Sequence, residues 1–298
     1  MKIFSGSASQ KLGIKIANDL NLSLEKIYLG RFSNDESQVW LKAEDFNTTA
    51  VLIQSLSRPV DEHLVQFCLM ADALKRGGVK KIVAVIPYLA YSKQDKIFRT
   101  GEPLSVKVIA KIIQTAKINK FITLDLHNKA IVGFFESPVI ELSAIPLFLE
   151  YFRKSNLKNT LVVAPDAGSI KASTSFAQSL GLEVAYIDKK RDLSNGKVSI
   201  LGINRQVKGN NIVMVDDMIS TGSTLIETAK FLKKQRVGKI TVAVSHHLFV
   251  PGVQEKIEQS LIDKLIITDT IERSNKKQYK KLKVLSVAPI IVKELRKI

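Results

Sequence analysis

The chain has 298 residues, 45% of them hydrophobic, which is enough to bury two ordinary cores, and we expect two domains. Its 35 lysines and 10 arginines give a net charge of +17, which favours anionic metabolites, while the bias towards lysine argues against a nucleic-acid groove. The single cysteine, Cys68, excludes an intrachain disulfide framework and indicates a reducing cytoplasm, and no apolar stretch is long enough to anchor the chain in a membrane.

The first half of the chain alternates short apolar strands with helical patterns. Strands are expected over 50–54 and 81–86 and helices over 62–75 and 105–115, after an opening strand at Ile3. Mostly parallel sheets covered by helices on both faces produce this alternation. Because such sheets bind ligands beyond the carboxyl ends of their strands, the polar segments that follow the strands are the places to look for function.

Three polar segments of this half carry candidate site residues. The first, 30–36, combines an aromatic ring with polar side chains, as recognition of a flat base requires. The second follows strand 81–86, and the third is a histidine after an apolar strand. Alone, the first two are also typical of ordinary surface turns and loops, and a lone histidine after a strand is more often structural than a ligand. The residues are Phe32, Asn34 and Glu36, then Lys93 and Gln94, then His127.

The second half of the chain repeats the first. Residues 71–85 and 229–243 align at an offset of 158, and both predict an amphipathic helix that turns into a buried strand. The strands expected over 50–54 and 211–215 precede these helices at nearly the same offset. The sequence therefore predicts a duplicated α/β unit, with domains over 1–145 and 146–298.

The most informative segment is 212–225, an apolar strand that runs into two carboxylates and then into a small polar turn before a helix over 224–234. The two acids can accept hydrogen bonds from a ribose diol, while N–H groups of the turn and the helix start can hold a phosphate. An acidic strand end before a capped helix is the simpler interpretation, but the full run favours a sugar-phosphate site. The residues are Asp216, Asp217, Ser220, Thr221, Gly222, Ser223 and Thr224.

This run resembles the phosphoribosyl-pyrophosphate signature shared by phosphoribosyltransferases and ribose-phosphate pyrophosphokinases. Segments similar to the second family specifically occur in family order, and the resemblance covers residues 1 to about 292. They are 30–36, 87–105, 124–135 and 163–172 with 186–191.

The resemblance implies an α/β fold of two duplicated phosphoribosyltransferase-like domains, each a mostly parallel sheet flanked by helices. The N-terminal domain would carry the ATP segments. The C-terminal domain would carry the ribose 5-phosphate loop and a mobile catalytic loop, with the last residues packing back on the N-terminal domain. A homo-oligomer is also implied.

The activity implied by the resemblance is that of a ribose-phosphate diphosphokinase, which transfers the diphosphate of ATP to O1 of ribose 5-phosphate and releases AMP. Phe32 would stack on adenine, with Asn34 and Glu36 on its edge, and Lys93 and Gln94 would contact the ATP phosphates. Asp216, Asp217 and the turn 220–224 would hold ribose 5-phosphate. His127 and Asp166 would place Mg²⁺, while Lys189 and Arg191 would close over the phosphates during catalysis.

The chain departs from the family pattern at three positions. Lys93 and Lys171 stand where arginine is frequent, and Ser169 replaces the second glycine of a Pro-Asp-x-Gly-Gly turn. A lysine keeps the charge of arginine but loses its bidentate fork.

Two alternatives come from other functional classes. A phosphoribosyltransferase would share the loop 216–224 but would not explain the duplicated domain or the segment 30–36. A non-catalytic regulatory member of the family would keep the fold and lose the chemical residues, which this chain retains.

Overall fold

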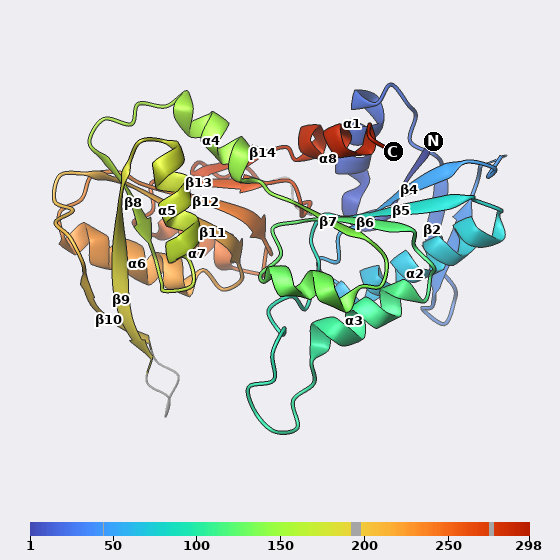
Figure 1. Cartoon of the computed structure of the whole chain (residues 1–298), viewed down its shortest axis with the longest axis horizontal. Coiled ribbons are helices and arrows are strands. Elements are labelled where there is room, and N and C mark those ends of the chain that lie inside the picture. The colour runs from blue at the N-terminus through green and yellow to red at the C-terminus, as the bar shows by residue number, and fades with distance from the viewer. Residues whose placement is uncertain (44, 192–197, 274–276) are drawn as a thin grey trace. The chain divides into compact units, whose positions relative to one another are not determined.

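The computed structural model describes residues 1–43, 45–191, 198–273 and 277–298, apart from the side chains of residues 190, 191, 198 and 199. The chain divides into two compact units. Unit 1 comprises 1–143, 269–272 and 286–298, and unit 2 comprises 144–268 and 273–285. Each unit is a mostly parallel sheet flanked by helices (Figure 1), which confirms the predicted α/β fold class.

Unit 1 is built on a five-stranded sheet in the order β1-β4-β5-β6-β7, with every pair of neighbours parallel. The central strands are buried because helices cover both faces, so they consist of continuous apolar residues. The strands are β1 (Lys2–Ser5), β4 (Thr49–Ile53), β5 (Lys81–Ile86), β6 (Lys120–Leu124) and β7 (Val139–Leu142).

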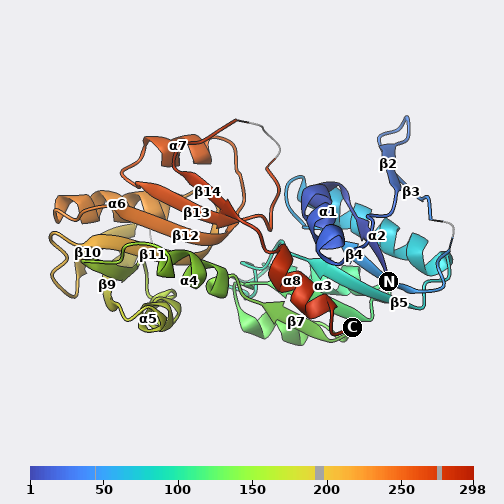
Figure 2. The same ribbon diagram turned by 90° about the horizontal axis from the view of Figure 1, so that it is seen from above.

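In unit 1, α1 and α8 lie on one side of the sheet, and α2 and α3 lie on the other (Figure 1). The expected helices 62–75 and 105–115 are confirmed as α2 and α3. An antiparallel hairpin of β2 (Ile27–Arg31) and β3 (Ser37–Leu41) projects from this unit (Figure 2). The helices are α1 (Gln10–Asp19), α2 (Val60–Arg76), α3 (Ser105–Gln114) and α8 (Ala288–Leu295), with the 3₁₀ turns η1 (Ser7–Ser9) and η2 (Lys129–Phe134).

Unit 2 is built on a seven-stranded sheet in the order β10-β9-β8-β11-β12-β13-β14, in which only β9 and β10 pair antiparallel. Its parallel part repeats unit 1, because β8, β11, β12, β13 and β14 follow in the same order as β1, β4, β5, β6 and β7. The strands are β8 (Thr160–Ala164), β9 (Glu183–Arg191), β10 (Val198–Ile203), β11 (Asn211–Ile219), β12 (Ile240–His247), β13 (Lys264–Thr268) and β14 (Leu282–Leu285).

The two faces of the unit 2 sheet carry separate hydrophobic cores. On one face, Ile212 and Met214 pack with α6 and α7, and on the other, Val213 and Val215 pack with α4 and α5. Side chains alternate along a strand, so Asp216 continues the face that α6 covers. The helices are α4 (Ile145–Arg153), α5 (Ile170–Ser179), α6 (Ser223–Lys234) and α7 (Val253–Gln259).

Within the described ranges, none of the helices combines the length and the apolarity that crossing a bilayer requires.

Candidate active site

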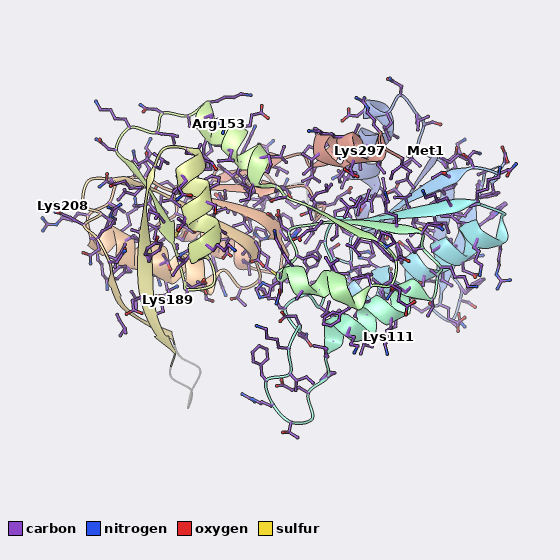
Figure 3. The ribbon with its side chains drawn as sticks, in the orientation of Figure 1. Met1, Lys111, Arg153, Lys189, Lys208 and Lys297 are labelled. Carbon is purple, nitrogen blue, oxygen red and sulfur yellow. The ribbon has the colours of Figure 1, made fainter. Side chains whose placement is uncertain are left out.

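Four charged side chains of unit 2, which we call the Asp–Lys cluster, come from three neighbouring strands or the turns after them. Asp166 follows β8, Lys189 lies on β9 (Figure 3), and Asp216 and Asp217 lie on β11. The register between β8 and β11 runs only to Val213, so the two acids occupy a part of β11 beyond that pairing. Both acids are partly buried there, at the end of the sheet where ligands of α/β proteins bind.

The pKa values show that members of this cluster interact. The pKa of Asp216 is raised to about 7, first by burial and then by the negative charges of Asp217 and Asp166. The pKa of Lys189 is lowered, because the cost of its burial outweighs the attraction of Asp166 and Asp216. Titratable groups perturbed by burial and by specific neighbours are typical of functional sites.

The turn after β8 fixes the carboxylate of Asp166. The backbone N–H of Ser169 donates to Asp166 Oδ1 at 3.0 Å, and the Ser169 hydroxyl donates to the Asp166 carbonyl at 2.9 Å. Ser169 itself is buried. The Ser169 hydroxyl therefore closes the turn, while the backbone N–H at this position, which a glycine would also supply, orients the carboxylate. Lys171 lies exposed on α5.

The predicted phosphate turn connects β11 to α6. Gly222 has φ +71°, a left-handed conformation that favours glycine, and α6 begins at Ser223. The side chains of Thr221, Ser223 and Thr224 are exposed, and the hydroxyls of Thr221 and Ser223 lie 3.1 Å apart. The first N–H groups of a helix and its dipole attract anions, so this turn offers donors and hydroxyls to a phosphate.

In unit 1, the turn of the β2–β3 hairpin carries the candidate base-binding residues. Phe32 is 51% exposed, which excludes a core role for its ring. The N–H of Glu36 donates to Asn34 Oδ1 at 3.3 Å, so Asn34 also stabilises the turn. An ion pair of 2.5 Å from Arg31 to Glu62 ties the hairpin to α2.

Lys93 and Gln94 lie in the segment between β5 and α3, and both side chains are exposed. Gln94 Oε1 accepts a hydrogen bond of 2.6 Å from the hydroxyl of Ser105, the first residue of α3. The Nδ2 group of Asn128 donates to Asp95 at 2.6 Å. This contact brings the segment that holds Lys93 and Gln94 beside the segment that holds His127.

His127 is exposed and follows β6, whose end is held by a 3.1 Å hydrogen bond from the N–H of Leu126 to Glu141. No group of three or more His, Cys, Asp or Glu side chains suited to a metal ion occurs in the described part of the chain. Mg²⁺ commonly binds through one or two carboxylates together with substrate phosphates, and it needs no such group. The single carboxylate of Asp166, which the turn after β8 orients, is sufficient for a cation of this kind.

The segment predicted as a basic loop differs in its local structure. Residues 188–191 belong to β9, whose register with β10 pairs Arg191 with Val198. The side chain of Arg191 and residues 192–197 lie outside the described residues, so the role predicted for Arg191 stays a prediction.

One contact of Lys189 was not evident from the sequence. Its Nζ donates a hydrogen bond of 3.1 Å to Thr228 Oγ1 on α6, and Thr228 is fully buried. The only signal in the sequence is the spacing from Thr224, because residues one helical turn apart share a face.

The family models, the relatives and the solved structure that match this chain all indicate the same family. The family model described as the N-terminal domain of ribose phosphate pyrophosphokinase matches residues 1–116, and that of the phosphoribosyl transferase domain matches 134–285. A ribose-phosphate pyrophosphokinase of Ralstonia nicotianae is 35% identical over 100% of this chain and 95% of its own length. One of Aquifex aeolicus is 36% identical over 100% and 96%. The crystal structure of a phosphoribosylpyrophosphate synthetase from Mycobacterium smegmatis matches with a TM-score of 0.91 and 29% identity, over 99% of this chain and 97% of the other.

Proposed function

The chain belongs to the ribose-phosphate pyrophosphokinase family, and on that premise we propose that the Asp–Lys cluster and the turn 220–224 hold the sugar phosphate while its O1 attacks ATP. The chain is an enzyme of nucleotide biosynthesis, a ribose-phosphate diphosphokinase. Its reaction transfers diphosphate from ATP to ribose 5-phosphate and yields phosphoribosyl pyrophosphate and AMP.

The observation that carries the proposal is the arrangement of Asp166, Lys189, Asp216 and Asp217 in unit 2, ahead of an exposed hydroxyl turn at a helix start. The two aspartates on β11 would accept hydrogen bonds from the ribose diol. The N–H groups and hydroxyls of the turn would bind the 5-phosphate. Together they would fix O1 for in-line attack on the β-phosphorus, so that positioning supplies much of the catalysis.

Lys189 would stabilise the charge that develops on the transferred diphosphate. Half burial strengthens such an interaction, because less water screens it. We propose the same role for Arg191 on the family resemblance alone.

In unit 1, Phe32 would stack on adenine, with Asn34 and Glu36 on its polar edge. Its exposed ring supports this assignment. Lys93 and Gln94 would contact the ATP phosphates. Their segment is hydrogen-bonded to the start of α3.

Mg²⁺ would neutralise phosphate charge and polarise the phosphorus that is attacked. We propose Asp166 as a metal ligand of unit 2 and, on the family resemblance, His127 as a metal ligand of unit 1. Asp166 is suited to this role because Ser169 orients its carboxylate. A homo-oligomer and a cytoplasmic location are proposed on the family resemblance and the single cysteine.

The test is an assay of the purified protein with ATP, Mg²⁺ and ribose 5-phosphate, with products separated by chromatography. AMP and phosphoribosyl pyrophosphate should form in equal amounts. Formation of ADP, or a requirement for a nucleobase, would contradict the proposal. Asp217→Asn should raise the KM for ribose 5-phosphate and leave that for ATP unchanged, as loss of a ground-state contact does.

A further inference from the structure

A buried threonine on α6 holds the amine of Lys189. The Lys189 Nζ donates to Thr228 Oγ1 at 3.1 Å, and Thr228 has 0% exposure. Side chains alternate between the two faces of a strand, so Lys189 shares a face of β9 with Ala185 and Ile187. Both of these pack in the core that α6 covers. The strand and the helix therefore direct the two polar groups towards each other.

A hydroxyl is unexpected at this position of α6. Its neighbours Leu225, Ala229 and Leu232 all belong to the hydrophobic core. Valine has the same shape as threonine, and burying a hydroxyl costs free energy unless a partner compensates. The partner that the structure provides is the amine of Lys189, so packing alone does not account for the threonine.

The same contact bears on the balance of charge around Lys189. The carboxylates of Asp166 and Asp216 attract the amine. Even so, within the part of the chain that the structure describes, its hydrogen bond goes to Thr228 and not to either carboxylate. An ammonium ion paired with a carboxylate would be less available to a phosphate.

We propose that Thr228 is a positioning residue that holds the Lys189 ammonium beside Asp166 and Asp216 but out of ion-pair contact with them, where it can bind the transferred diphosphate. This inference rests on the proposed role of Lys189. Without the Thr228 hydroxyl, the flexible lysine side chain pairs with the carboxylate of Asp166 or Asp216, and substrate phosphates must then compete for it.

Kinetics of Thr228→Val, Thr228→Ala and Thr228→Ser test the proposal. Both variants without a hydroxyl should lower kcat about 10-fold, since a hydrogen bond to a charged group is lost, and Thr228→Ser should restore it to within about twofold. The KM for ribose 5-phosphate should change less than about twofold. Thr160→Val is the matched control, because Thr160 is also buried and its hydroxyl donates to the Lys158 carbonyl at the start of β8; the kcat of this variant should be unchanged.

A double-mutant cycle separates positioning of Lys189 from a general effect on packing. Thr228→Val should lower kcat no further in a Lys189→Ala background, because the two residues act through one contact. Additive losses, or a full kcat in both variants that lack the hydroxyl, would overturn the proposal. Melting temperatures identify any variant that fails to fold, and Thr228→Ala then replaces Thr228→Val.

Amine labelling of the substrate-free protein tests the contact without reference to activity. Competitive acetylation followed by mass spectrometry gives the pH midpoint for labelling of Lys189. In Thr228→Val this midpoint should rise by about 1 pH unit, because the amine pairs with the carboxylate of Asp166 or Asp216, and Thr228→Ser should reverse the rise. A midpoint that is unchanged or lower would overturn the inference. If the wild-type protein made no phosphoribosyl pyrophosphate, the proposed function would fail, but this labelling would still decide the role of Thr228.

Discussion

The backbone N–H of Asp217 donates a hydrogen bond of 2.9 Å to Oδ1 of Asp216, so the carboxylate of the first acid is fixed by the backbone of the second. Asp217 Oδ1 in turn accepts a hydrogen bond of 2.7 Å from the N–H of Met218. These local bonds hold both side chains in place along β11. Burial, and then the negative charge of the neighbouring Asp217, raise the pKa of Asp216 to about 7.

The raised pKa of Asp216 predicts how stability depends on pH. The unfolded chain releases this proton near pH 4, whereas the folded chain keeps it up to about pH 7. The folded state thus binds more protons between these values, and its free energy of unfolding falls as the pH rises through the window. Asp216→Asn should remove that fall and raise the free energy of unfolding at about pH 8 by roughly 2–4 kcal/mol.

Urea unfolding of wild type and Asp216→Asn at about pH 4.5 and about pH 8 measures this effect. The free energies of unfolding of the two proteins should differ little at the lower pH. As a control, in Asp217→Asn the free energy of unfolding should fall over a lower pH range than in the wild type. One of the charges that raises the Asp216 pKa is gone in this variant. An equal stability difference at both pH values would refute the explanation.

Phe32→Ala should weaken ATP binding by roughly 1–3 kcal/mol, the contribution of one stack between a base and an aromatic ring. The KM for ribose 5-phosphate should hardly change. Trp40 lies on the same hairpin and is 61% exposed, so Trp40→Ala is a matched control that should leave ATP binding intact. Isothermal titration with ATP measures both variants, and equal losses would show that the hairpin as a whole, and not the Phe32 ring, is responsible.

Ser169→Ala should destabilise the protein by about 1 kcal/mol, because the Ser169 hydroxyl bridges the turn to the backbone of Asp166. Ser169→Gly, which restores the family pattern, should destabilise it further through the added freedom of the unfolded chain. Thermal and urea unfolding measure both effects. A more stable glycine variant would show that the turn is strained by the serine.

The parallel sheets and the duplication were predictable because apolar strands and amphipathic helices repeat at a fixed offset. The exact extent of β11 was not predictable, since Asp216 and Asp217 interrupt its apolar run and yet stay within the strand. Lys189 and Arg191 were expected in a mobile loop from the family resemblance, and the charged end of β9 shows none of the apolar alternation of a half-buried strand. Residues 188–191 form a strand because they pair with β10.

The candidate site could likewise be predicted only in part. The residues from Asp216 to Thr224 are contiguous, and their chemistry could be inferred from one segment. The contact of Lys189 with Thr228 joins residues that are 39 positions apart and depends on how α6 packs on the sheet. Similarly, the sequence shows Ser169 only as a departure from a glycine pattern. Its hydrogen bonds to Asp166 are evident only in the folded turn.

Gly222→Ala tests whether the phosphate turn needs its left-handed conformation. An alanine at φ +71° is strained by about 1–2 kcal/mol, and its Cβ would lie 3.4 Å from Val253 Cγ1. Relaxation of that strain must move the N–H groups of the turn. The KM for ribose 5-phosphate should therefore rise by about 10-fold or more, while the KM for ATP stays the same.

Gly209→Ala provides the control for this prediction. Gly209 also lies in unit 2 and has φ +77°, and a Cβ there meets no atom within 4 Å. Its substitution should cause a similar loss of stability from backbone strain alone. Because Gly209 precedes β11 at the amino end of the strand, the KM for ribose 5-phosphate should not change. If both alanine variants raised that KM equally, the effect would come from general destabilisation, and the turn 220–224 would lose its assignment as the phosphate site.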